Sequence, residues 1–528
     1  MPKKLEKDAP MLSGHGVRMR EPVVAEFNGK NIGNQKEPGL FGQMFPSLAK
    51  NPLIVGDGDL KKLADAMLDP TLNAATPNVD PGNNPVDPRD NLNVPAGFTY
   101  LGQFIDHDLT LDTSGIGERI DDPLSIENFR TPALDLDSIY GHGPGASPQL
   151  YARDPDKNFS PSAKFLIGVA DASRNVNEAD PPIPSFPNDL PRSPEGFALI
   201  GDHRNDENLV VAQTHLAFLK FHNKVVDKLK AEGVASDKLF AEARKLVTWH
   251  YQWIVLFDFV ERITETGIVA KILHDGRKFY RFKTRPYMPM EFSVAAYRLG
   301  HSMVRQEYSH NRAFRPKVPR IFPATLRFLF NFTGLSGIIH GDKNKFPEHL
   351  PSNWIIDWRR YFDFGTPATE PNFEFNHSRR LDPFIIEQLH TLPDGSNLPF
   401  RNLKRGVMMR LPSGQDVANF MKTHVKKPVL TPDEIASGTD GAVAKGLGLH
   451  KKTPLWYYIL KEAQVRTGGE RLGPYGGRLV AEVFTGIVQG DDDSFMSQKN
   501  WKPSLGPVAG RFTMVDMLRF VNDINPIG

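Results

Sequence analysis

Apolar residues recur at helical spacing through most of the chain after residue 90. Spacings of three and four residues between apolar positions are typical of helices that bury one face. The pattern predicts helices over 97–109, 208–233, 237–265, 289–308, 415–425, 454–465 and 476–490. Segments with the alternation of a half-buried strand are few, and no repeat of fixed period is present. The sequence therefore predicts a mainly α-helical protein with long loops between its helices.

The first 90 residues differ in composition from the rest. They are rich in Pro, Gly and Asn, and segment 76–95 has too many turn-forming residues for a helix or a central strand. One short helix is predicted around 60–69. We expect residues 1–90 to form an extended N-terminal arm and residues 91–528 to form one large helical domain.

The bulk composition narrows the classes of function. The 528 residues carry a net charge of +2, with 40% hydrophobic and 24% charged residues, which is typical of a soluble globular protein and gives no sign of nucleic-acid binding. The absence of cysteine excludes disulfides, thiolate nucleophiles and thiolate metal ligands. We find no signal peptide and expect no transmembrane segment, because no apolar run reaches about 18 residues. The oligomeric state stays unknown.

Three ionisable residues stand in a row inside an apolar helical pattern, "GQFIDHDLTLD" at 102–112. Consecutive helix residues project about 100° apart, so Asp106, His107 and Asp108 point in three directions, whereas Gln103 shares a face with His107. One segment can thus supply a base, a polar or covalent anchor and a ligand for a separate cation. A surface helix with a capping Asp and a structural His would also explain it.

Two further clusters carry candidate chemistry. In "GDHRNDENLVV", Arg204, Glu207 and Asn208 stand at i, i+3 and i+4, which predicts one shared helical face. Acidic residues at a helix start are also favoured by the helix dipole alone. In "AAYRLGHSMV", His301 lies in an apolar helix beside Gly300, which would let a flat ligand approach the backbone. Taken singly, such a histidine is more often a core residue.

Together, these stretches resemble the animal-type haem peroxidases of the peroxidase–cyclooxygenase superfamily, with bacterial peroxinectin-like members as the nearest type. "FIDHDL" resembles the distal-histidine motif, "GDHRNDEN" the distal-arginine segment and "YRLGHSMV" the proximal-histidine helix. "RNLKRG" resembles the asparagine-bearing segment that follows, and "LDLDSIYG" the calcium loop. Each motif alone is a weak signal, but the occurrence of all five in the order found in the family makes the resemblance specific.

The resemblance implies roles around a bound haem b. His107 resembles the distal base that moves a proton between the oxygens of hydrogen peroxide, and Arg204 the arginine that stabilises the separating charge. Gln103 would hydrogen-bond the distal water or halide. His301 resembles the axial ligand of the iron, and Asn402 would accept the other ring N–H of that histidine.

Four more residues match positions that hold the haem in the family. Arg298 and Arg405 match residues that pair with the propionates. Asp106 and Glu207 match the carboxylates that form ester bonds with haem methyl groups, so covalent attachment is chemically available. A sulfonium link would need Met where this chain has Asn208, which argues against strong chloride oxidation.

The resemblance also implies a calcium site. Thr131, Asp135 and Asp137, with the carbonyl of Ala133, match the calcium loop, and Asp108 matches its distant ligand. The mammalian pattern has Ser in place of the last Asp of the loop, so this site would carry one more negative charge. The spacing does not fit an EF-hand. Bound Ca²⁺ would fix the helix that carries the distal base.

The implied activity is that of a peroxidase, in which hydrogen peroxide oxidises the haem to an oxoferryl state. Small reducing substrates return it: phenols, anilines, or anions such as iodide, bromide or thiocyanate. The main alternative, a fatty-acid dioxygenase of the superfamily, would need a radical Tyr three residues before the proximal His. Arg298 occupies that position, and Tyr297 lies one residue earlier.

A non-catalytic haem-binding or adhesion protein is a further alternative. No "RGD" sequence is present, and both His107 and Arg204 are retained. Most relatives of this type are secreted. Without a signal peptide, a bacterial cytoplasmic location and export by a non-classical route both stay open.

Overall fold

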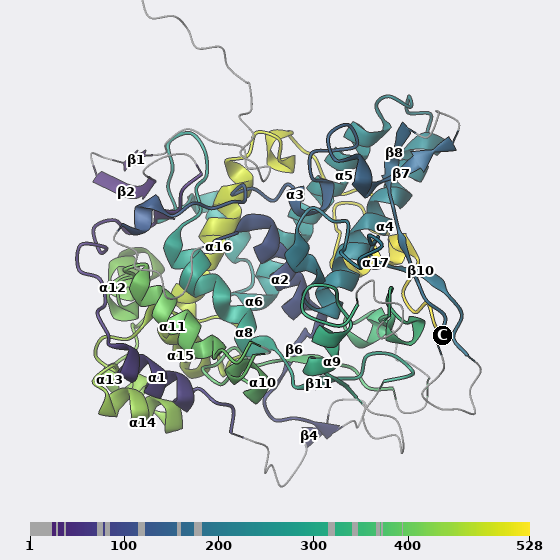
Figure 1. Cartoon of the computed structure of the whole chain (residues 1–528). Helices are drawn as coiled ribbons and strands as arrows, with labels where there is room; N and C mark the ends of the chain where they lie inside the picture. Colours follow the sequence, from purple (N-terminus) through teal and green to yellow (C-terminus); the bar gives the residue numbers. More distant parts are fainter. Residues whose placement is uncertain are drawn as a thin grey trace, which may run out of the picture.

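The computed structural model of the chain describes a mainly helical molecule (Figure 1). The residues described are 24–27, 30–35, 39–70, 78–79, 85–113, 122–155, 160–173, 182–314, 323–339, 347–365, 370, 373–392 and 394–528. Within them, no helix combines the length and the apolar character needed to cross a membrane.

The α-helices of these residues vary from one turn to six. They are α1 Asp57–Ala66, α2 Gly97–Leu109, α3 Asp137–Tyr140, α4 Leu209–Ala231, α5 Leu239–Ile254, α6 Glu261–Ile263, α7 Ile268–Asp275, α8 Gly300–Met303, α9 Leu326–Asn331, α10 Glu387–His390, α11 Leu398–Met408, α12 Gly414–Val425, α13 Pro432–Ile435, α14 Gly438–Gly446, α15 Leu455–Thr467, α16 Pro474–Gln489 and α17 Met514–Val521.

The strands are short and form small antiparallel sheets. Their bounds are β1 Val24–Phe27, β2 Lys30–Gln35, β3 Gly42–Gln43, β4 Asn78–Val79, β5 Pro85–Val86, β6 Asp90–Pro95, β7 Tyr151–Asp154, β8 Ser160–Phe165, β9 Gly168–Ala170, β10 Phe186–Asp189, β11 Glu307–Tyr308, β12 Ala324–Thr325 and β13 His377–Arg379. The pairs are β1-β2-β3, β4-β5, β6-β13, β7-β8, β9-β10 and β11-β12.

The core forms where α2 packs against α4 and α5. Phe104 of α2 stacks on Phe218 of α4, with ring centroids 5.0 Å apart, and meets Tyr251 of α5 edge-on at 6.2 Å. All three rings are buried, and such aromatic pairs contribute beyond the area that they bury. The packing fixes the orientation of α2, and with it the direction of the polar residues on its other faces.

The start of α2 requires a residue without a side chain. The backbone N–H of Gly97 donates to the carbonyl of Tyr361 at 2.9 Å. A Cβ at Gly97 would lie 2.6 Å from that carbonyl oxygen and 2.4 Å from the ring of Phe362, closer than packed atoms come. The preceding strand β6 pairs with β13, which ties the same end of the helix to the C-terminal half of the chain.

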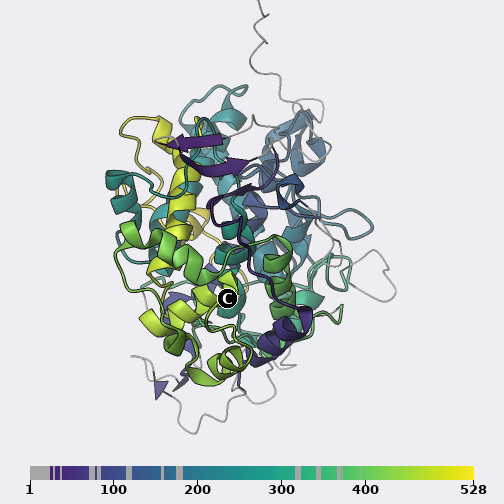
Figure 2. The same cartoon turned by 90° about the vertical axis from the view of Figure 1, so that its left-hand side faces the viewer.

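The longest described stretch of the N-terminal region, residues 39–70, lies along the helical body (Figure 2). The backbone N–H groups of Met44 and Phe45 donate to the buried carboxylate of Glu291, at 2.9 and 3.1 Å. The N–H of Leu53 donates to the carbonyl of Leu411. Helix α1 confirms the short helix predicted around 60–69.

Most predicted helices are confirmed, but three stretches differ. In the predicted helix 237–265, a π-helical turn Val255–Val260 separates α5 from α6. The predicted helix 289–308 consists of a π-helical turn Glu291–Ala295, a 3-10 turn Ala296–Leu299 and α8, and it ends before the extended Val304. The break falls at Ala295, whose φ of −128° and ψ of −71° leave the helical region. Departures of this kind concentrate at functional sites.

The segment before α4 is also not a regular helix. Residues His203–Asp206 form a 3-10 turn, because the carboxylate of Asp202 accepts from the N–H of Arg204 at 2.9 Å. Asn208 is extended and caps α4, its side-chain oxygen accepting from Val210 and Val211. The predicted shared helical face of Arg204, Glu207 and Asn208 is therefore wrong, although all three residues line one cavity.

Candidate active site

A cavity of about 630 Å³ lies between α2, residues 204–208 and the helical segment 297–304. One set of lining residues, which we call the His107 side, comprises Gln103, Asp106, His107, Arg204, Glu207 and Asn208. A second set, the His301 side, comprises Tyr297, Arg298, Gly300, His301 and Arg401. A Cβ added to Gly300 would meet no atom within 4 Å, so the backbone is open to a ligand there.

The proton position on His107 is set by its neighbours. Nδ1 lies 2.9 Å from the side-chain oxygen of Asn205, and the amide nitrogen of Asn205 lies 3.0 Å from Nδ1 of His215. Burial lowers the pKa of His215 to about 3, so its ring is neutral, and its Nδ1 accepts because the amide nitrogen of Asn205 is a donor. The amide of Asn205 must then present its oxygen to His107, which places a proton on Nδ1 and leaves Nε2 as a base.

Arg204 is held by a network of charges. Its guanidinium donates to the carboxylate of Asp202 through Nε at 3.1 Å and Nη2 at 2.7 Å, and Nη2 also donates to the carbonyl of His107 at 2.9 Å. Arg130 pairs with Asp202 as well. Burial alone would raise the pKa of Asp202, but Arg204 and Arg130 hold it far below its ordinary range.

A hydrogen-bonded chain of three side chains lines the cavity beside His107. Gln103 donates to Glu207 at 2.5 Å and accepts from Asn208 at 3.1 Å. The same oxygen of Glu207 lies 3.5 Å from Nε2 of His107. Asp106 lines the cavity one helical position away, and its carboxylate accepts from Thr110 at 3.1 Å. The predicted shared face of Gln103 and His107 agrees with this arrangement.

His301 contacts Asn402, but through the amide nitrogen. Nδ2 of Asn402 lies 2.7 Å from Nδ1 of His301, and the amide oxygen accepts from Nη1 of Arg298 at 2.6 Å. The expectation that Asn402 accepts the ring N–H therefore differs from this geometry, because Arg298 occupies the oxygen. Burial, with Arg298 and Arg401 nearby, lowers the pKa of His301 to about 3, so the ring is neutral.

The two arginines expected to pair with propionates are placed differently. Arg298 lines the cavity, whereas Arg405 is not among its lining residues and forms an ion pair with Asp112. Arg401, one helical turn earlier on α11, lines the cavity instead. The expectation for Arg405 thus shifts to Arg401, because α11 turns Arg405 toward the loop that follows α2.

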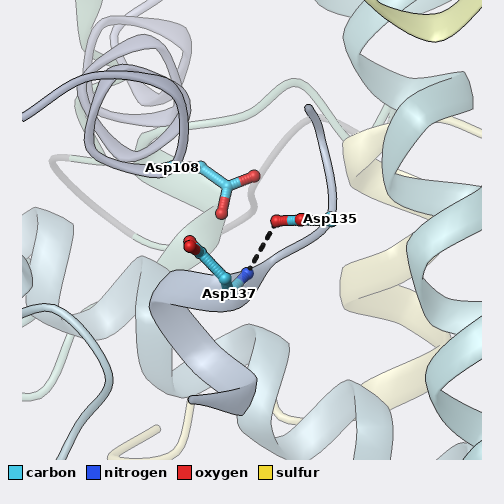
Figure 3. A group of neighbouring side chains, drawn as sticks. All are labelled: Asp108, Asp135 and Asp137. Carbon is cyan, nitrogen blue, oxygen red and sulfur yellow. Dashed lines mark hydrogen bonds between the residues drawn. The ribbon is translucent and has the colours of Figure 1, made fainter. Parts of the chain in front are cut away.

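The three carboxylates of the expected calcium site lie close to one another (Figure 3). None of them lines the cavity. One oxygen each from Asp108, Asp135 and Asp137 lie within 4.8 Å of one another. Asp108 also accepts from Ser138 Oγ at 3.0 Å and from the N–H of Leu136 at 3.2 Å, where a left-handed φ of 57° bends the loop. Burial and the neighbouring carboxylates raise the pKa of Asp108 well above its ordinary value and that of Asp137 to about 7. A divalent cation would relieve this repulsion.

The two remaining members of the expected calcium set lie in the same loop. Thr131 and Ala133 are buried, and the N–H of Ala133 donates to the carbonyl of Thr131 at 2.7 Å. Arg130, which precedes them, donates to Asp137 at 3.2 Å and so links the carboxylate cluster to Asp202 and the Arg204 network.

Sequence reasoning missed Asp202, Asn205, His215 and Arg401. The first two lie inside "GDHRNDEN", where a run of polar residues before a buried helix signalled a site without showing which residues touch. His215 looked like one apolar-face position of α4 among others. The resemblance pointed to Arg405, and Arg401, four residues earlier on the same helix, was not considered.

Comparisons with known proteins show similarity to haem peroxidases. The family model "Animal haem peroxidase" matches residues 111–326. The chain is 32% identical to dog (Canis lupus familiaris) thyroid peroxidase over 194 residues, 34% of this chain and 20% of that protein. It is 24% identical to peroxidasin homolog pxn-2 of Caenorhabditis elegans over 370 residues, 69% of this chain and 26% of that protein. The chain thus spans about a quarter or less of these relatives.

Two solved structures share the fold. Peroxidase A from Dictyostelium discoideum superposes with a TM-score of 0.56 at 14% identity, covering 90% of this chain and 92% of that one. The fatty acid alpha-dioxygenase of Oryza sativa gives the same TM-score and identity, covering 92% of this chain and 79% of that one. Residues 111–326 thus match the animal haem peroxidase family model, and the described fold is shared with a peroxidase and a dioxygenase.

Proposed function

We propose that this protein is a haem peroxidase that uses hydrogen peroxide to oxidise small organic donors or easily oxidised anions such as iodide, bromide and thiocyanate. The observation that carries the proposal is the pair of histidines on one cavity, the buried His107 supported by Arg204 and the half-buried His301 supported by Asn402. Both a peroxidase and a dioxygenase share this fold, so the choice between the two activities rests on the residues of the site.

The residues present fit a haem. The imidazole of His301 is neutral and lines the cavity, and it could bind a metal through Nε2 once Asn402 turns its amide oxygen to Nδ1 and the ring proton moves there. Gly300 leaves room for a flat ring. Arg298 and Arg401 offer two cations for the ring's carboxylates. Bound there, the haem would supply the redox chemistry that no side chain can provide.

His107 performs the proton transfer. Because Asn205 keeps a proton on Nδ1, Nε2 is free to take a proton from peroxide and to return it to the departing oxygen. Glu207, 3.5 Å from Nε2, stabilises the imidazolium formed between the two steps. Burial opposes ionisation of Glu207, but the interaction with protonated His107 and the charge of Arg204 lower its pKa below its ordinary value.

Arg204 stabilises the negative charge that develops as the O–O bond separates. Asp202 fixes two of its nitrogens, and the carbonyl of His107 fixes its orientation relative to the base. A charge that is already oriented needs no reorganisation during the reaction. Gln103 would orient the water or halide beside it.

Asp106 and Glu207 are the carboxylates that would hold the haem covalently. Both line the cavity, and the short bond from Gln103 presents Glu207 to its interior. Asn208 caps α4 and cannot form a sulfonium link, so we propose that strong chloride oxidation is absent.

We also propose that Asp108, Asp135 and Asp137 bind Ca²⁺, with Thr131 and Ala133 completing the set. Calcium prefers six to eight hard oxygen ligands, partly from carboxylates and partly from backbone carbonyls. The convergence of three partly or fully buried carboxylates supports this site. Its occupant would fix α2 one residue beyond His107.

A dioxygenase is the second candidate, because Tyr297 lines the cavity. Its hydroxyl donates to the carbonyl of Gly102 at 3.0 Å, and its ring stacks on Phe292 with centroids 4.8 Å apart. A hydroxyl bonded to the backbone is turned away from an incoming fatty acid. The peroxidase remains the better-supported proposal.

The test is an absorption spectrum of the protein supplied with haem, before and after one equivalent of hydrogen peroxide. A Soret band that shifts on peroxide and returns on adding iodide or a phenol is the expected result. A protein that binds no haem would refute the proposal. A Soret band that does not change on adding peroxide but changes on adding a fatty acid and oxygen would favour the dioxygenase.

A further inference from the structure

A line of buried aromatic residues leads away from the cavity. Tyr100 of α2 lines the cavity, and its hydroxyl donates to that of Tyr308 at 2.8 Å. The ring of Tyr308 in turn stacks on Tyr361, with centroids 5.8 Å apart and planes 16° apart. All three phenols are at most 1% exposed.

The line continues toward the surface through His310. The hydroxyl of Tyr361 lies 2.9 Å from Nδ1 of His310, and Nε2 lies 2.9 Å from the carbonyl of Trp354. A carbonyl only accepts hydrogen bonds, so Nε2 carries the proton and Nδ1 accepts from Tyr361. The ring of His310 lies 5.8 Å from that of Tyr361 and 6.0 Å from that of Trp354.

Trp354 is buried but contacts a ring that is partly exposed to solvent. It is sandwiched between Phe314 and Phe332, with centroids 3.9 and 4.3 Å away. Phe328, 5.8 Å away, is 39% exposed. An oxidisable indole therefore ends a continuous path of ring contacts that starts at the cavity.

We propose that Tyr100, Tyr308, Tyr361 and Trp354 form an electron-transfer path from the surface to the cavity, in which Tyr361 is the phenol that is oxidised and His310 holds its proton. The path would let the protein take electrons from phenolic donors that never enter the cavity. It rests on the proposed peroxidase function, which supplies the oxidant.

Tyr361 is chosen because an oxidised phenol loses its proton and needs a base to receive it. Tyr100 donates to another hydroxyl, and the hydroxyl of Tyr308 accepts from Tyr100 and from the N–H of Arg305. Tyr361 alone among the three phenols contacts an imidazole. Burial lowers the pKa of His310 to about 4, so the ring is neutral and ready to accept.

The electrons and protons balance along the path. Each electron taken up in the cavity leaves Tyr361 through the contacts of Tyr308 and Tyr100, while the Tyr361 proton moves to Nδ1 of His310. When Trp354 supplies an electron to Tyr361, that proton returns. Oxidised Trp354 takes an electron from a phenol at the surface, whose proton passes to water. The cavity takes up one proton from solvent per electron as peroxide is reduced to water.

The chain contains a matched control. The hydroxyl of Tyr140 lies 3.0 Å from Nδ1 of His222, and Nε2 of His222 lies 2.8 Å from the carbonyl of Ala163. This buried pair repeats the Tyr361–His310 geometry, but neither residue lines the cavity. Tyr140→Phe therefore reports the cost of losing a buried Tyr–His bond without touching the path.

The first experiment is electron paramagnetic resonance of the haem-loaded protein, frozen within milliseconds of adding one equivalent of peroxide with no donor. We expect a tyrosyl radical that narrows when the protein carries ring-deuterated tyrosine. Tyr361→Phe removes this signal, and Trp354→Phe retains it with a longer lifetime. Tyr140→Phe leaves it unchanged.

The second experiment compares iodide with a phenol coupled to a soluble polymer too large for the cavity. Tyr361→Phe and Trp354→Phe should each lower kcat/KM for the polymer by about tenfold or more and leave iodide oxidation unchanged. Wild-type turnover of iodide without a tyrosyl radical, or an unaltered polymer rate in both variants, overturns the path while the peroxidase stands. Failure of wild type to oxidise iodide overturns both.

Discussion

Each side of the cavity has a histidine in contact with an asparagine, but the two asparagines present different amide atoms to the ring. On the His107 side, the imidazole Nδ1 meets the amide oxygen of Asn205; on the His301 side, it meets the amide nitrogen of Asn402. The second partner of each asparagine makes the difference. Asn205 is fixed by the acceptor His215, whereas Asn402 is fixed by the donor Arg298. The residue that holds the other end of the asparagine amide thus determines which nitrogen of the histidine carries the proton.

This difference suits a base on one side and implies a rearrangement on the other. An imidazole that gives Nε2 to iron carries its proton on Nδ1 and needs an acceptor there. Asn402 can become that acceptor if it turns its oxygen to His301, which requires Arg298 to take another acceptor. A haem propionate would be such an acceptor, and Arg298 lines the cavity in which the haem would lie.

Substitution of the two histidines should separate the sides most strongly. His107→Gln removes the proton acceptor, and we expect the rate of reaction with peroxide to fall by roughly 10²–10⁴-fold with the Soret band retained. His301→Gln should instead lose the axial ligand and the ferric spectrum of the wild type. Stopped-flow spectroscopy measures both, with the exposed His142→Gln as the control. Equal loss of haem in both histidine variants would contradict the division of roles.

Arg204 should come next in size. Arg204→Gln removes the oriented charge, and we expect a fall of roughly 10²–10³-fold in the peroxide reaction at unchanged haem content. Arg401→Gln, on the His301 side, serves as the comparison because it removes a cavity cation without a contact to His107. It should weaken haem binding and leave the peroxide rate constant of the loaded protein intact. The reverse pattern would show that the two arginines have been assigned to the wrong sides.

Substitutions of Asn402 and Asn205 should affect haem affinity and the peroxide reaction differently. Asn402→Leu removes the partner of the axial histidine, and we expect haem affinity to fall by about 10–100-fold. Asn402→Asp supplies an obligatory acceptor for Nδ1 and should restore most of that affinity. Asn205→Leu should leave affinity unchanged but slow the peroxide reaction. Titration of haem into the three variants decides this, and a uniform loss of affinity would remove the asymmetry.

The comparison also explains what the sequence could predict. Helical periodicity predicted α4, α5, α12, α15 and α16, because each buries an apolar face over many residues. The directions of His107 and Asp108 also follow from helical geometry, since α2 is regular over both. Where the backbone leaves the α-helix, in segments 203–208 and 291–299, side-chain directions could not be predicted. Asn205 was missed because its partner His107 lies 98 residues away along the chain.

The smallest expected effect concerns the carboxylate cluster that anchors the His107 side. The folded chain holds a proton on Asp137 up to a pKa of about 7, whereas an unfolded Asp loses it near pH 4. Between these values the folded state binds more protons, so the free energy of unfolding of the calcium-free protein falls as pH rises. Because Asp137 is partly exposed and paired with Arg130, we expect a loss on the order of 1 kcal/mol.

Thermal unfolding in a chelator between pH 4.5 and 7.5 measures this loss, with Asp137→Ser as the matched variant. The variant removes the titrating carboxylate, so its stability should vary less with pH than that of the wild type. Added Ca²⁺ should stabilise the wild type most at the high end of the range, where all three carboxylates are ionised and binding to the folded state is strongest. If Ca²⁺ leaves the transition unchanged at every pH, Asp108 is held by Ser138 and Leu136 alone, and the His107 side needs no cation to keep its geometry.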